Sequence, residues 1–128
     1  MVTSAMTRAL DPELAAAYVH ELSADVTGVI VLDPEGQRLA GPDAMEAPAQ
    51  ALLAALEEEG ATVLLPAGIV WIVKGPERTV VAAAGPAAQP GPTALDVALA
   101  AGAAGPSFIE ERPSEPLKNA ASDVIAAT

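Results

Sequence analysis

The sequence predicts an α+β domain in which helices cover both faces of one sheet. Three observations indicate this fold class. The 128 residues are enough for one domain and too few for two good cores. Helix-like and strand-like segments follow one another in the order α-β-β-α-β-β-β-α. Strand-like segments that are apolar at consecutive positions are typical of strands covered on both faces, and three are found, at 26–32, 69–73 and 80–84.

The first helix is predicted within "LDPELAAAYVHELSAD", residues 10–25. Asp11 is expected as its N-cap and Pro12 as its first helical residue, because proline lacks only an amide that is unpaired there anyway. A spacing of four residues predicts the apolar stripe. This stripe comprises Leu14, Tyr18 and Leu22, with Ala15 and Val19 beside them.

A hairpin follows, with an apolar first strand at 26–32 and a polar return strand at 37–40. The linking "DPEG" suits a type I turn that Asp33 starts and a left-handed glycine follows. The polar return strand is expected at an edge of the sheet, where one side of a strand lacks a neighbour.

A second helix is predicted before Gly60, in "DAMEAPAQALLAALEEE". Asp43 and Glu46 have the spacing of a capping box. Pro48 moves the expected start of regular helix to about Ala47. The apolar face is expected to comprise Ala49, Leu52, Leu53 and Leu56.

Three more strands are expected in "ATVLL", "GIVWIVK" and "TVVAAAG", the last two joined by a turn at "GPER". The small residues 82–84 indicate a central strand against which helices pack closely, and Trp71 is expected in the core. A closing helix is predicted at 93–101. For the tail, residues 105–128, the sequence favours a disordered end over a short helix on Leu117, Ala121, Val124 and Ile125.

The segment 61–65 is expected at the opposite edge of the sheet. Its apolar residues include no charge that would protect an open edge. Because such a strand invites pairing with another chain, it is predicted either to aggregate or to join two copies.

The composition excludes several classes of partner. The net charge is −11, which disfavours nucleic acid and anionic membranes and weakly favours a basic partner. The chain has no cysteine, so disulfides and thiolate chemistry are excluded. Neither a signal peptide nor a membrane span is apparent, and a cytoplasmic protein is expected.

We expect no enzyme, no cofactor, no catalytic residue and no metal site. The motifs GxxxxGK[ST], GxGxxG and GxSxG are absent. The single histidine, His20, is expected on the solvent side of the first helix. Asp33 and Asp43 could hold a divalent ion, but turn and cap roles explain them more simply.

Three glutamates end the second helix, where they oppose the helix dipole. They form either an acidic contact patch or a solvated helix end, and both interpretations stay open. The residues are Glu57, Glu58 and Glu59.

The element order, together with "TGVIVLDPEGQRLAG" after the first helix, resembles the Roadblock/dynein light chain domain family. A strand ending in Asp33, a short turn with Gly36 and a return strand before a long helix are typical of it. "IVWIVKGPERTVVAAAG" looks like the last hairpin of the family, and 93–101 like its closing helix. The resemblance covers roughly residues 10–104.

The resemblance implies a three-layer α/β/α arrangement with a five-stranded antiparallel sheet. It implies the second helix on one face and the first and third on the other. Members commonly form homodimers through the second helix and the third strand, here Leu53, Leu56, Ala61, Thr62, Val63, Leu64 and Leu65. Bacterial members often regulate or scaffold Ras-like small GTPases. A profilin-like sensor domain of PAS or GAF type, with a roomy ligand cavity, is the alternative.

Overall fold

The computed structural model describes residues 12–22, 26–56, 59–86, 97, 101 and 114–128. The helical elements are α2 (Pro12–Leu22), the 3-10 turn η1 (Asp43–Met45), α3 (Glu46–Ala55) and α5 (Glu115–Ala126). The strands are β1 (Val26–Leu32), β2 (Arg38–Ala40), β3 (Gly60–Leu65), β4 (Gly68–Lys74) and β5 (Thr79–Ala84).

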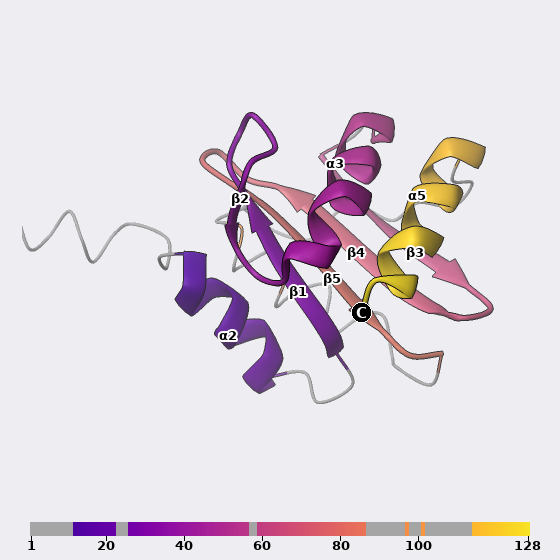
Figure 1. Cartoon of the computed structure of the whole chain (residues 1–128), viewed down its shortest axis with the longest axis horizontal. Coiled ribbons are helices and arrows are strands. Elements are labelled where there is room, and N and C mark those ends of the chain that lie inside the picture. The colour runs from indigo at the N-terminus through magenta and orange to yellow at the C-terminus, as the bar shows by residue number, and fades with distance from the viewer. Residues whose placement is uncertain (1–11, 23–25, 57–58, 87–96, 98–100, 102–113) are drawn as a thin grey trace, which may run out of the picture.

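The five strands form one antiparallel sheet in the order β2-β1-β5-β4-β3 (Figure 1). The predicted α+β class and five-stranded antiparallel sheet are therefore confirmed. The Ala-rich β5 lies at the centre, and the polar β2 and the apolar β3 form the two edges, as the sequence indicates.

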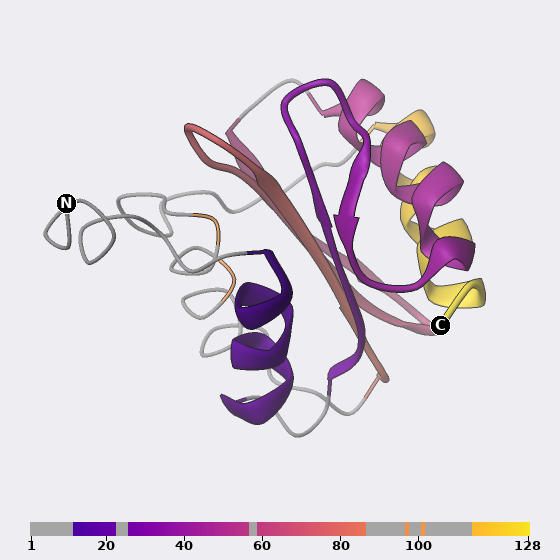
Figure 2. The same cartoon turned by 60° about the vertical axis from the view of Figure 1, so that its left-hand side comes forward.

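Helices pack on both faces of the sheet (Figure 2). On one face α2 packs beside alternate strand residues such as Val29, Val31 and Trp71. On the other face α3 and α5 pack against the intervening residues, among them Ile30 and Leu32. Because consecutive strand residues point to opposite faces, β1 is apolar and buried at each position from Val29 to Leu32. Trp71 is fully buried, as expected.

Only one side of the apolar stripe predicted for the first helix faces the sheet. Ala15 and Val19 are fully buried, whereas Leu14 is 55% exposed and Tyr18 is half-buried. Ala15 and Val19 directly follow Leu14 and Tyr18 in the chain, so the two pairs lie on adjacent sides of the helix. The side with the smaller residues faces the sheet. The contacts of α2 with β1 and β2 place Ala15 and Val19 against the sheet.

The capping box predicted for the second helix is wrong. No side chain caps η1 or α3. Asp43 pairs instead with the Arg38 guanidinium at 2.6 Å, and the Glu46 carboxylate accepts from the Arg38 amide at 3.2 Å. Both acidic residues are drawn to β2, which lies directly before η1 in the chain.

The β1–β2 turn has the predicted form. The Asp33 carboxylate accepts from the amides of Glu35 and Gln37, each at 2.9 Å. Gly36 has a φ of 89°, in the left-handed region that favours glycine. Asp33 is thus the turn residue that the sequence indicates.

The predicted closing helix at 93–101 lies outside the described residues except at two positions. Val97 and Ala101 are helical and buried, and they belong to the core on the α2 face. These two residues agree with a helix on that face.

The tail contains α5, although the sequence favours disorder there. The helix packs beside α3 and contacts β3, β4 and β5. Its residues Leu117, Ala120, Ala121 and Val124 are buried. Short-helix signals are weak in isolation, and the apolar surface that stabilises this helix belongs to distant parts of the chain.

Candidate interaction surface

The β3 edge, residues 60–65, is paired on one side only. Its register with β4 runs from Gly60↔Val73 to Leu65↔Gly68. Within the part of the chain that the structure describes, no strand pairs with its other side. Such a strand presents free amide and carbonyl groups to a further strand.

The side chains of β3 are not equally accessible. Ala61 and Val63 belong to the core on the α3 side, and Thr62 is buried on the opposite face. Leu65 is half-buried. Leu64 is 63% exposed, which is unusual for a leucine in a strand this apolar. The β3 edge therefore offers its backbone and the Leu64 side chain.

The two predicted helical contact residues do not lie at the β3 edge. Leu56 is buried in the core cluster next to α3. Leu53 is half-buried and lines a groove with Glu35 and Gly36 of the β1–β2 turn. The side of α3 that faces β3 is occupied by α5.

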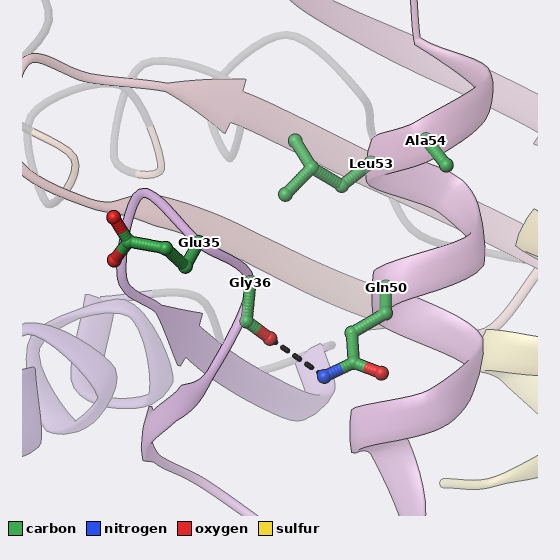
Figure 3. A pocket seen from close by; sticks show the side chains of 5 residues that line it. All are labelled: Glu35, Gly36, Gln50, Leu53 and Ala54. Carbon is green, nitrogen blue, oxygen red and sulfur yellow. Dashed lines mark hydrogen bonds between the residues drawn. The ribbon is translucent and has the colours of Figure 1, made fainter.

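That groove lies between the β1–β2 turn and α3 (Figure 3). It has a volume of about 380 Å³, is open to solvent, and is also lined by Gln50 and Ala54. The Gln50 amide donates to the Gly36 carbonyl at 2.7 Å, which ties the turn to the helix. An open groove of this kind is not the enclosed cavity that the sensor alternative calls for.

Of the predicted acidic patch, Glu57 and Glu58 lie outside the described residues. Glu59 is exposed directly before β3, and its carbonyl accepts from the Lys74 amide at 2.8 Å. Glu59 is therefore an exposed acidic residue at the start of β3.

The remaining sequence predictions concern His20 and metal ligands. His20 is exposed, as predicted. Among the described residues, no three His, Asp or Glu side chains group as metal ligands. In the same residues, no helix has the length and apolarity required to cross a membrane.

Arg78 is a residue that sequence reasoning missed. It lies in the β4–β5 turn and is only 8% exposed, and its Nη1 atom has no hydrogen-bond partner within the described part of the chain. The sequence contained no signal for this, because "GPER" reads as an exposed turn. A buried guanidinium nitrogen without a partner loses hydration and gains nothing in return.

Among solved structures, the chain is similar to the Roadblock/LC7 domain from Streptomyces avermitilis, with a TM-score of 0.57 and 17% sequence identity. The similarity covers 74% of this chain and 93% of that domain. No family model and no curated protein matches the chain. The chain thus has the Roadblock/LC7 fold, and the resemblance seen in the sequence is confirmed for the fold.

Proposed function

We propose that this chain, which has the Roadblock/LC7 fold, is a non-enzymatic adaptor that pairs with a second copy and binds a Ras-like small GTPase in the cytoplasm. The fold is typically that of a small non-catalytic adaptor module. The observation that carries the proposal is the β3 edge, which is apolar, unpaired among the described strands and ends in an exposed Leu64.

Pairing of two copies along β3 would make one continuous sheet. In a two-fold arrangement each β3 contributes the same residues, so Leu64 of one copy lies close to the β3 edge of the other. Backbone hydrogen bonds would form along the edge, and burial of two Leu64 side chains would add apolar stabilisation. Leu53 and Leu56 do not lie at the β3 edge, so we assign the pairing to residues 61–65.

The GTPase part of the proposal rests on the fold and on charge. The chain carries a net charge of −11, which favours a partner with a basic contact face. We propose Glu57, Glu58 and Glu59 as acidic contacts at the end of the paired sheet. Charges of this kind act mainly on the rate of association, which should fall as salt rises.

The test is a calorimetric titration with a Ras-like GTPase from the same genome, loaded either with GDP or with a non-hydrolysable GTP analogue. We expect binding that favours one nucleotide state. The triple variant Glu57→Gln, Glu58→Gln, Glu59→Gln should bind more weakly at low salt and nearly equally at high salt. Absence of binding in both nucleotide states, with a folded protein in the same cell, overturns this partner.

A further inference from the structure

The helix α5 covers the side of α3 that faces the β3 edge. It packs beside α3 and contacts β3 and β4 on the same face of the sheet (Figure 1). Its end and the start of α3 meet at one place, because Thr128 and Met45 both lie against Gly28. The two helices are therefore antiparallel neighbours, and α5 lies between α3 and the β3 edge.

The two sides of α5 differ in polarity. Its buried residues recur at the spacing of one helix face: Leu117, Ala120, Ala121 and Val124. Its exposed residues are Glu115, Pro116, Asn119, Ser122, Asp123 and Ala126. The helix α5 therefore covers apolar surface of the sheet and of α3 and exposes its own polar side to solvent.

The start of α5 is capped locally, and its far end contacts β1. The Ser114 hydroxyl accepts from the Leu117 amide at 3.3 Å and caps the first turn. At the other end, the Thr27 hydroxyl of β1 donates to the Thr128 hydroxyl at 3.3 Å. Between these ends α5 buries one leucine, one valine and two alanines, and the partly buried Ile125 packs beside them.

This arrangement bears on how a second copy can approach. If two β3 edges pair about a two-fold axis, each α3 has its counterpart on the same face and antiparallel to it. With α5 in place, the helices that meet across the axis are the two α5 helices, through polar faces. With α5 displaced, the apolar flank of α3 becomes available to α3 of the second copy.

We propose that α5 is a displaceable cap that weakens self-association through the β3 edge, and that its release exposes the surface on which α3 of a second copy packs. The proposal rests on the pairing along β3 put forward above. It gives residues 105–128, which lie outside the domain expected at 10–104, a regulatory role.

The first test compares two charge insertions one residue apart. Ala121→Glu places a carboxylate in the buried contact, whereas Ser122→Glu places the same charge on the exposed face of α5. Release of α5 is followed by hydrogen exchange of its amides, and self-association by sedimentation equilibrium. We expect Ala121→Glu to self-associate at least tenfold more tightly than the wild type, and Ser122→Glu to match the wild type.

The second test holds α5 closed in an intact fold. The chain has no cysteine, so the double variant Thr27→Cys, Thr128→Cys can form only one intramolecular disulfide. We expect the oxidised protein to self-associate more weakly than the same protein after reduction. Equal self-association of the two forms overturns the proposal, even if Ala121→Glu fails to fold.

The outcomes distinguish failure of the α5 cap from failure of the proposed pairing along β3. Adding Leu64→Glu to Ala121→Glu should abolish the gain in self-association, because the association that release of α5 favours still requires the β3 edge. If the wild type and a variant with released α5 form equally tight dimers that Leu64→Glu disrupts, the cap is refuted and the pairing stands. If no form self-associates although α5 is released, the pairing itself is refuted.

Discussion

The Thr27 hydroxyl in β1 donates a hydrogen bond to the Thr128 hydroxyl, 101 residues later in the chain, over 3.3 Å. The Thr128 hydroxyl in turn donates to the Ile125 carbonyl at 2.8 Å. The end of the chain is thereby fixed to the strand that opens the sheet. This contact joins α5, for which the sequence favours disorder, to the part of the fold that the sequence predicts best.

Gly28→Val should loosen the end of α5. A Cβ at Gly28 would lie 2.8 Å from Thr128 Cγ2 and 3.0 Å from Met45 Sδ, so one of them must move. We expect the free energy of unfolding to fall by about 1–3 kcal/mol, as overpacking does. Urea unfolding measures this, with Gly85→Val as the control, because a Cβ there meets no atom within 4 Å. Equal losses in both variants would contradict the tight contact.

Leu64→Glu should weaken self-association. It places a charge on the exposed leucine of the β3 edge without entering the core. Leu39→Glu is the matched control, since Leu39 is 41% exposed on β2 at the opposite edge. We expect the dissociation constant from sedimentation equilibrium to rise at least tenfold for Leu64→Glu and to stay near the wild-type value for Leu39→Glu. An equal effect of the two variants would place the pairing elsewhere.

Ser114→Ala and Asp43→Ala should differ in their effect on stability. Ser114 caps α5, and loss of an N-cap costs about 1 kcal/mol. Asp43 instead forms an ion pair with Arg38 in which its side chain is 81% exposed, so its loss should cost no more than about 0.5 kcal/mol. Chemical denaturation of both variants tests the assignment. A larger loss for Asp43→Ala would restore the capping role that the structure contradicts.

Arg78→Met should leave the fold as stable or make it more stable. Methionine keeps much of the buried stem and removes a guanidinium whose Nη1 atom has no partner. We expect the free energy of unfolding to stay level or rise by about 1 kcal/mol, because the substitution removes the cost of burying an unpaired polar group. Arg38→Met is the control, since that guanidinium pairs with Asp43 and its replacement should be slightly destabilising. Destabilisation by Arg78→Met beyond that of Arg38→Met would indicate an acidic partner for Arg78.

The purified chain is expected not to hydrolyse GTP or ATP. The phosphate-binding motifs are absent from its sequence, and the proposed role requires no catalytic residue. Phosphate release is measured across the fractions of a size-exclusion column. Hydrolysis that follows the protein peak and disappears in Lys74→Ala would contradict the non-enzymatic proposal.

The local features of this fold follow from sequence alone. The unbroken apolar character of β1, β4 and β5 indicates strands covered on both faces, because side chains alternate along any strand. The turn at Asp33–Gly36 is equally local, since a carboxylate and a left-handed glycine suffice to form it. The position of β3 at an edge also follows, from its place between a helix and a hairpin.

Other features depend on residues far apart in the chain. On β3 the sequence marks five apolar or small candidates. The structure buries Ala61 and Val63 beneath α3 and α5 and leaves Leu64, on the opposite face, exposed. The sequence of α2 does not indicate which of its apolar residues face the sheet. The contacts with β1 and β2 bury Ala15 and Val19.

The position of α5 depends most clearly on long-range packing. Local sequence supplies only an amphipathic pattern around Leu117 and Val124, which is too weak to hold a short helix in water. The sheet and α3 supply the apolar surface that stabilises this helix, and that surface exists only once strands distant in sequence have paired. The free energy of hydrophobic burial depends on the apolar area removed from water, not on how close the buried residues are in the sequence. The surface that α5 covers therefore cannot be read from the sequence around α5.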